Sequence, residues 1–138
     1  MKSYDNCILF LLAKAYQKAH ADFKKRLHSY GLTPIQHLVL EALWDEDGLS
    51  AGEIAKRLVF DGATLSGVLD RLSAGDWVLK QSAEEDKRML RISLTQKSKE
   101  LKPKLAAVRN KTNEDLLARF SLEEKVLLKR LLRDIQTD

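Results

Sequence analysis

The sequence contains little of what disulfide-bonded or membrane-spanning proteins are built from. Its single cysteine, Cys7, excludes an intrachain disulfide and fits a reducing cytosol. The longest apolar run, residues 7–13, lies between Asp5 and Lys14 and is far too short to span a membrane. No segment resembles a signal peptide, and the sequence has no repeats or low-complexity tracts. We therefore expect a cytoplasmic protein.

Signals for metal binding and catalysis are also missing. The three histidines, His20, His28 and His37, have no ligand-like spacing to a cysteine or to a pair of acids, so no metal site is expected. The sequence has no phosphate-binding loop, no nucleophile with an adjacent base and no evident pair of carboxylates. We expect neither an enzyme nor a bound cofactor.

The charge distribution permits an anionic partner without requiring one. The chain has 138 residues, 44% of them hydrophobic, and a formal net charge of +4. Segment 49–95 is nevertheless neutral, with seven basic and seven acidic residues, and the basic excess lies in residues 1–30 and 96–138. A protein that binds DNA phosphates should show a local basic excess. If the partner is DNA, basic side chains must gather on one face, two subunits must combine, or the affinity must be modest.

Residues 48–95 carry the strongest local pattern, which predicts two short helices and a hairpin. Ser50 and Glu53 form a capping box at the first helix, Val59 and Phe60 close it, and Asp61 suits the next N-cap. Four apolar residues at helical spacing predict the buried face of the second helix: Leu65, Val68, Leu69 and Leu72. Its opposite face is small or polar: Ala63, Thr64, Ser66, Gly67 and Asp70. Such a helix fits a DNA major groove about 12 Å wide, although an ordinary surface helix explains this helix alone equally well.

The following segment favours the DNA-binding interpretation. Gly75 ends the second helix, and a strand is expected to begin at Trp77. A polar tip, residues 81–88, precedes a return strand, residues 89–94, whose alternation places Leu90, Ile92 and Leu94 on one side. Two helices followed by a hairpin with a charged tip are typical of a winged helix-turn-helix, whose wing can reach a minor groove.

Long helices are expected on both sides of this module. Helical periodicity covers residues 4–30, and a second helix begins at Thr33 with Pro34 and Gln36 in a capping box. After the hairpin, Thr95 caps a helix to about residue 117 that Pro103 should loosen, and Ser121 begins a last helix. The terminal helices carry more apolar surface than one module can cover. This excess predicts a homodimer.

Four segments together resemble the MarR-type winged helix-turn-helix regulators: LTPIQHLVLEAL (32–43), GLSAGEIAKRL (48–58), TLSGVLDRLSAGDWV (64–78) and DKRMLRISLT (86–95). The resemblance implies a mainly α fold with a small β-hairpin wing. It implies a single domain over residues 1–138, with a DNA-binding core at 32–95 and dimerisation helices at 1–31 and 96–138. The implied function is sequence-specific binding of a pseudo-palindromic operator in double-stranded DNA by a homodimer, as a repressor that a small effector or an oxidant releases.

The resemblance also assigns residues to the DNA contact. Arg88 would enter the minor groove while Asp86 orients nearby basic groups such as Arg71. The full set of candidate DNA-binding residues is Ser50, Ala63, Thr64, Ser66, Gly67, Arg71, Asp86, Lys87 and Arg88. The alternative for each is a solvated surface position.

Within the family, the pattern is closest to the branch that senses organic hydroperoxides. Its reactive cysteine aligns with Leu9 rather than Cys7, and its two tyrosines fall where this chain has Pro34 and His37. An inert thiol is therefore favoured over a redox role for Cys7. Tyr16, Tyr30 and His37 are candidates for an effector pocket, although packing in the core or exposure at the surface is the favoured interpretation of these residues.

Two rival functions stay open at this stage. One is a winged-helix module for protein interaction that does not bind DNA, and the other is a small redox protein built around Cys7. Salt-dependent binding to duplex DNA separates them from a regulator.

Overall fold

The computed structural model describes residues 2–58, 60–83, 85 and 88–138, and these form a mainly helical structure with one small sheet. The helices are η1 (Ser3–Asn6), α1 (Ile8–Leu27), η2 (His28–Tyr30), α2 (Pro34–Asp45), α3 (Ala51–Arg57), α4 (Gly62–Ala74), α5 (Gln96–Leu116) and α6 (Leu122–Ile135). The strands are β1 (Leu49–Ser50), β2 (Val78–Ser82) and β3 (Leu90–Leu94). The expected fold class, mainly α with a hairpin wing, is confirmed.

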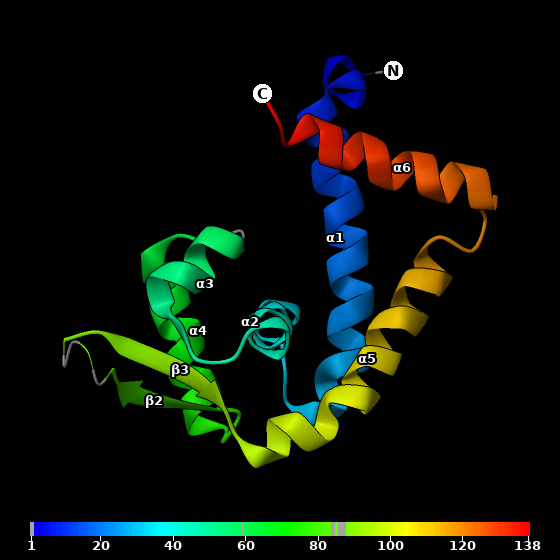
Figure 1. Ribbon diagram of the computed structural model, residues 1–138. Coiled ribbons are helices and arrows are strands. Elements are labelled where there is room, and N and C mark those ends of the chain that lie inside the picture. Colours follow the sequence, from blue (N-terminus) through cyan, green and yellow to red (C-terminus); the bar gives the residue numbers. More distant parts are fainter. Residues whose placement is uncertain (1, 59, 84, 86–87) are drawn as a thin grey trace.

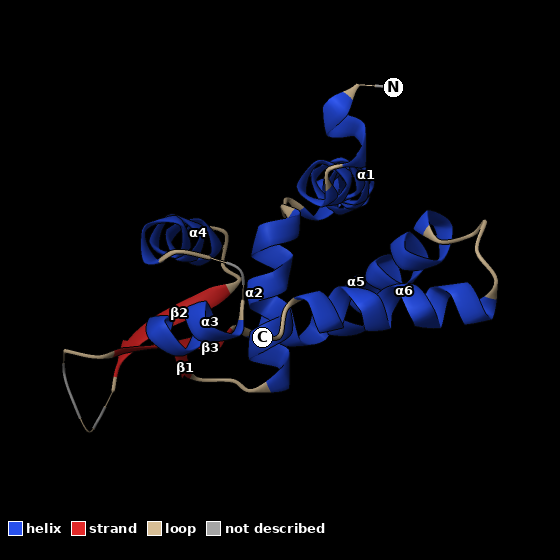
Figure 2. Cartoon of the chain, turned by 90° about the horizontal axis from the view of Figure 1, so that it is seen from above, coloured by secondary structure: helices blue, strands red, loops and turns tan. Residues whose placement is uncertain are grey.

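Helix α2 lies between two parts of the molecule. In Figure 1, α3, α4 and the sheet lie on one side of it, and α1 and α5 lie on the other. Figure 2, viewed from above, shows the β2–β3 hairpin projecting away from the long helices. This arrangement leaves the hairpin and one face of α4 accessible at one side of the molecule.

Local side-chain caps begin four helices where the sequence predicts them. Thr33 and Ser121 form complete capping boxes with Gln36 and Glu124. The side chains of Asp61 and Thr95 accept hydrogen bonds from the third backbone N–H of α4 and α5. Each cap satisfies a donor that the helix leaves unpaired, so the starts of these helices follow from residues three positions apart.

The capping box predicted at Ser50 is only half formed. The Ser50 hydroxyl accepts from the Glu53 N–H at 3.2 Å, but it also donates to the Glu53 carboxylate, again at 3.2 Å. The carboxylate is therefore bonded to the cap side chain and not to its backbone. Ser50 is at the same time the last residue of β1, opposite Arg91, which places its backbone in the sheet.

The sheet differs from the expected hairpin in having a third strand. Its order is β1-β3-β2, all antiparallel, with Leu49 opposite Ile92 and Val78 opposite Leu94. A strand of two residues is too short to produce a visible alternation in the sequence. Leu90 was expected to face inward with Ile92 and Leu94, but 46% of it is exposed because it lies at the outer end of the hairpin, opposite Ser82.

Other helix boundaries also differ from those expected. The first helix, expected over 4–30, divides into η1, α1 and η2, and Gly31 follows in the left-handed conformation with φ of 70°. Helix α3 ends at Arg57 rather than Phe60, and Val59 lies outside the described residues. Helix α5 runs through Pro103 as one helix. The last residue of α2 is Asp45.

One apolar core joins the two parts. The four predicted apolar residues of α4 are all buried, and they pack with side chains of α1, α2, α5 and the sheet: Leu27, Val39, Leu40, Leu43, Ile92 and Leu105. Full burial of each such side chain contributes about 1.5–3 kcal/mol. The buried face of α4 fixes which of its residues can point outward.

Polar contacts join α5 to the α4–β2 turn and to α2. The Lys97 ammonium donates to the Gly75 carbonyl at 2.7 Å and lies 4.2 Å from the centre of the Trp77 ring. The Thr95 hydroxyl donates to the Asp76 carbonyl at 2.8 Å. On the other side, Arg109 donates to Glu41 of α2 at 2.7 Å. The C-terminal end of α4 is therefore joined to the start of α5, and α5 is joined to α2.

The apolar faces of the terminal helices are uncovered. Helix α6 contains no buried residue, and its exposed large apolar side chains are Leu122, Val126, Leu127, Leu131, Leu132 and Ile135. Ile8, Leu9 and Leu11 near the start of α1 are exposed as well. In the part of the chain that the structure describes, no helix is long and apolar enough to cross a membrane.

Candidate nucleic-acid interface

The outward face of α4 includes the residues of this helix that the sequence assigns to DNA contact. Ala63, Thr64, Ser66 and Arg71 are exposed, and Gly67 is half-buried. A Cβ atom added at Gly67 would have no atom within 4 Å, so packing does not require a glycine there. Glycine costs a helix up to about 1 kcal/mol relative to alanine. A glycine at this position would, however, allow another molecule to approach the helix backbone closely.

The N-terminus of α4 carries an anchored acid. The Asp61 carboxylate accepts from the Thr64 N–H at 2.7 Å. The hydrogen bonds from the Thr64 backbone, and next from its side chain, hold the pKa of Asp61 below its usual value. This cap fixes the first turn of α4, where the exposed hydroxyl-bearing residues begin.

Several cations of the module are already paired with acids. Lys80 of β2 is paired with Asp70 of α4, Arg57 with Glu46, and Arg91 with Glu53 and Glu85. In the described part of segment 49–95, Lys56 and Arg71 are exposed cations without an ion pair to another described residue. Arg71 is therefore an exposed cation of α4 that is not paired with any described acid.

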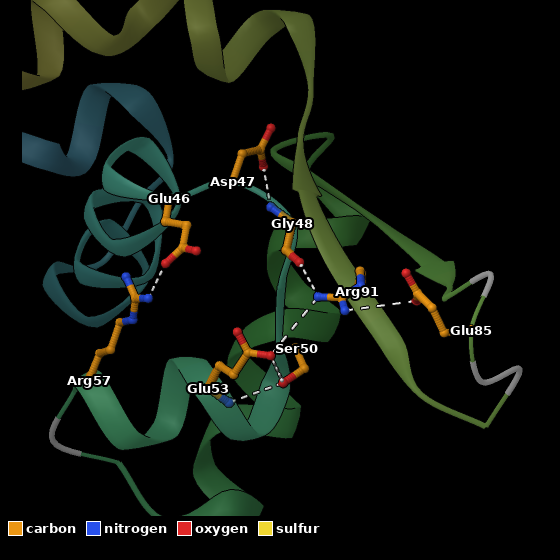
Figure 3. A network of polar contacts seen from close by, with 8 residues as sticks. All are labelled: Glu46, Asp47, Gly48, Ser50, Glu53, Arg57, Glu85 and Arg91. Carbon is orange, nitrogen blue, oxygen red and sulfur yellow. Dashed lines mark hydrogen bonds and ion pairs between the residues drawn. The ribbon is translucent and has the colours of Figure 1, made fainter.

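The polar network around Arg91, drawn in Figure 3, connects β3 to the segment before β1, to α3 and to the hairpin tip. Arg91 donates to the Gly48 carbonyl at 3.1 Å, between Glu53 of α3 and Glu85 of the hairpin. Asp47 accepts from the N–H groups of Gly48 and Leu94, both at 2.9 Å. Gly48 has φ of 76°, a conformation that glycine adopts without strain.

The tip of the hairpin is described only in part. Asp86 and Lys87, two of the candidate DNA-binding residues, lie outside the described residues. Arg88 is exposed in the turn before β3. At the base of the tip, the Ala83 N–H donates to the Met89 carbonyl at 2.9 Å, and Ala83 itself is buried. Ser50 is half-buried at the start of α3.

A cavity of about 550 Å³ lies between α1, α2 and α4. Its wall includes Ala63, Thr64, Gly67 and Arg71, which the sequence assigns to DNA contact. The other residues of the wall were assigned to no functional site by the sequence: His20, Lys24, Thr33, Ile35, Gln36 and Val68. Only tertiary packing brings α1 opposite α4, so no sequence signal marked Lys24. A second cavity of about 220 Å³, lined mostly by apolar atoms, lies between helices α3 and α4 and strands β2 and β3.

The three residues proposed for an effector pocket line neither of these two cavities. Tyr16 is 59% exposed on α1, Tyr30 packs partly buried against the core, and His37 is buried. They therefore lie in three different environments.

His37 occupies an aromatic site inside the molecule. Its ring lies 4.9 Å from that of Phe23 and 5.8 Å from that of Trp44, and neither ring nitrogen has a hydrogen-bond partner among the described residues. Burial, and next the charge of Arg109, lower its pKa from 6.5 to about 4. The Glu41 carboxylate lies 3.2 Å from Nε2 and opposes this shift, but burial dominates. His37 is therefore neutral at pH 7.

Cys7 is an exposed free thiol at the N-cap of α1. No described residue forms a hydrogen bond or ion pair with its side chain. Leu9, where the resemblance places the sensor position, is 73% exposed.

Comparison with known proteins identifies regulators of one family. A model of the MarR family matches residues 30–89. TtmR of Methylorubrum extorquens, an HTH-type transcriptional regulator, is 38% identical over 107 residues, which is 75% of this chain, and the chain spans about half, 53%, of TtmR. MgrA of Staphylococcus aureus, of the same type, is 30% identical over 126 residues, covering 91% of this chain and 84% of MgrA.

Among solved structures, BpsR of Bordetella bronchiseptica has a TM-score of 0.92 and 25% identity, covering 100% of this chain and 99% of BpsR. The DNA binding of BpsR is regulated by 6-hydroxynicotinic acid.

Proposed function

The chain belongs to the MarR family of helix-turn-helix transcriptional regulators, and we propose that it binds a pseudo-palindromic operator as a homodimer and represses transcription until a small anion releases it. Membership of this family makes it a regulator and not an enzyme. The observation that carries the proposal is the outward face of α4, which is small, polar and open. We place the activity in the cytoplasm.

Helix α4 acts as the recognition helix in the major groove. Gly67 keeps the centre of its face low, and the hydroxyls of Thr64 and Ser66 bond to phosphates or base edges. Arg71 has no ion pair among the described residues and contacts the DNA backbone or a guanine edge. Arg88 of the wing enters the adjacent minor groove, while Asp86 orients nearby basic groups. Lys87 belongs to the same DNA contact, and Ser50 meets a phosphate.

The dimer doubles these contacts. The uncovered apolar faces of α1 and α6 pair with a second copy of the chain, residues 1–31 and 96–138 forming the interface. Two copies of α4 then address two half-sites. The internal ion pairs of the module leave few cations for phosphates, so we expect a modest salt dependence for each subunit.

Arg71→Ala and Arg88→Ala should each weaken operator binding by about 1–3 kcal/mol, because each removes a charged contact to DNA. The measurement is fluorescence anisotropy at fixed salt, with a duplex that the wild-type protein selects from a randomised pool. Arg119→Ala, in the turn between α5 and α6, is the control and should bind normally.

An unchanged affinity would remove that arginine from the interface. Failure of the wild type to bind any duplex in a salt-dependent way would instead favour the rival function, a winged helix used for protein interaction.

The cavity between α1, α2 and α4 is the effector site in this proposal. Lys24 and Arg71 offer cations to a carboxylate, while Ile35 and Val68 offer apolar contacts to a ring. An anion there competes with DNA for Arg71 and changes the position of α4 relative to α1. The regulation of BpsR by a small aromatic acid supports this choice of ligand class.

6-Hydroxynicotinic acid should therefore release the operator duplex, and Lys24→Gln should raise the concentration needed by about tenfold, because one charge-assisted contact is lost. Anisotropy titrations of both proteins give the midpoints. Lys18→Gln, on the same helix but outside the cavity wall, should titrate like the wild type. Equal midpoints for Lys24→Gln and wild type would place the effector elsewhere.

In this proposal the chain shares its fold with the hydroperoxide-sensing branch, but oxidation of a cysteine is not the event that releases DNA. Cys7 lies at the N-terminus of α1, a position that can activate a thiol, but no described side chain bonds to it to hold or further activate a thiolate. Binding of an anion, rather than oxidation of Cys7, releases the operator.

A further inference from the structure

One arginine of the wing is shared by three segments of the chain. Arg91 is the second residue of β3, opposite Ser50 of β1 and Gln81 of β2. Its Nη1 donates to the Gly48 carbonyl at 3.1 Å and lies 4.0 Å from Oε1 of Glu53, while Nη2 lies 3.9 Å from Oε2 of Glu85 (Figure 3). The guanidinium thus lies between a carboxylate of α3 and a carboxylate of the hairpin tip.

These ion pairs contribute little to the stability of the fold. The side chains of Arg91, Glu53 and Glu85 are 40%, 46% and 76% exposed. Exposed pairs of this kind contribute about 0–1 kcal/mol, because water already solvates both charges. The arrangement matters more for the electric potential at this surface than for folding.

Both carboxylates lie beside groups that the proposed function places on DNA. Glu53 is bonded to the hydroxyl of Ser50, and Glu85 belongs to the same hairpin tip as Arg88. A phosphate that approaches either group meets a negative charge of its own sign, which repels it. A guanidinium about 4 Å from each carboxylate offsets that repulsion.

We propose that Arg91 is a positioning residue that shields operator phosphates from Glu53 and Glu85, and that it is not itself a phosphate ligand. The inference rests on the proposed function, since it concerns the same DNA interface. Nη1 is already bonded to the Gly48 carbonyl, which holds the guanidinium beside the two acids. The neutral charge of segment 49–95 then reflects acids that are shielded rather than a weak interface.

A double-mutant cycle tests the shielding. R91Q should bind the selected duplex about fivefold more weakly, because two carboxylates are then unshielded. E85Q alone should change affinity by less than about twofold, since Glu85 is already shielded. R91Q/E85Q should recover to within about twofold of the wild type, a coupling that independent residues do not show.

The salt dependence of binding distinguishes shielding from phosphate contact. R91Q/E85Q should keep the wild-type slope of log affinity against log salt, whereas loss of one phosphate ligand from each subunit lowers the slope by about 1.8 for a dimer. R91K keeps the charge and should bind within about twofold of the wild type. R91K binding as weakly as R91Q, or a double variant as weak as R91Q, overturns the proposal.

Arg57 supplies the matched control. It is also ion-paired with acids, and its side chain is 39% exposed, but its partners are Asp45 and Glu46 rather than residues of the wing. R57Q should show no coupling to E85Q.

Thermal melts should place all variants within a few degrees of the wild type, because only exposed pairs are removed. If the wild type binds DNA without the Arg91–Glu85 coupling, only this inference fails; if the wild type binds no DNA, the proposed function fails with it.

Discussion

A chain that ends at residue 121 should sediment as a monomer and bind the operator about 100- to 10,000-fold more weakly than the full-length protein, because the second half-site contact is no longer linked to the first. Helix α6 has no buried residue, and six of its seven large apolar side chains are between 37% and 73% exposed. A continuous apolar face of this kind marks an interaction surface. In a homodimer it is covered by the second copy.

Point variants make the same test without shortening the chain. Val126→Glu and Leu131→Glu place charges on the apolar face of α6 and should separate the subunits, since an unpaired charge is costly to bury. Lys129→Ala, an exposed polar position on the same helix, should leave the dimer intact. Sedimentation velocity at micromolar concentration reports the result, and a monomeric full-length protein under these conditions would refute the dimer.

The second large effect concerns pH. The free energy of unfolding should fall by about 3 kcal/mol between pH 7 and pH 4 through His37 alone, because its pKa is 6.5 in the unfolded chain and about 4 in the folded one. The unfolded state binds the proton first as the pH falls. The contribution is therefore fully present above pH 6.5 and is lost progressively down to about pH 4.

His37→Phe should remove this pH dependence. A neutral ring fits between Phe23 and Trp44, and it carries no proton at any pH. Urea denaturation of wild type and variant at one protein concentration, at pH 7, 5.5 and 4.5, gives the difference, from which the titration of the carboxylates cancels. His28→Gln, at an exposed histidine, should follow the wild type. Parallel stability curves for His37→Phe and wild type would show that burial does not hold His37 neutral.

Local chemistry made much of the fold predictable. Thr33, Asp61, Thr95 and Ser121 each bond to a backbone N–H three residues ahead, so the starts of four helices follow from neighbouring residues. The buried face of α4 follows from the helical period, because residues three and four apart lie on one side. That period also determines the opposite face, including Thr64, Gly67 and Arg71.

Contacts between distant segments were not predictable in the same way. Strand β1 forms because Leu49 pairs with Ile92 of β3. At the junction of β1 and α3, the Glu53 carboxylate accepts a hydrogen bond from the Ser50 hydroxyl instead of the Ser50 backbone. The exposure of Leu90 depends on where the helices stop covering the hairpin, which alternation within one strand does not indicate.

The sequence by itself determined the family, the small, polar face of α4 that we propose reads DNA, and the neutral charge of the module that contains α4. Tertiary structure decided which charges meet: Arg91 bonds to Gly48, 43 positions away, and lies between two acids from different segments. It also opened the cavity between α1, α2 and α4 and enclosed His37. Caps and helical periods act within one turn of the chain, whereas ion pairs, cavities and burial depend on distances that exist only after the segments have packed.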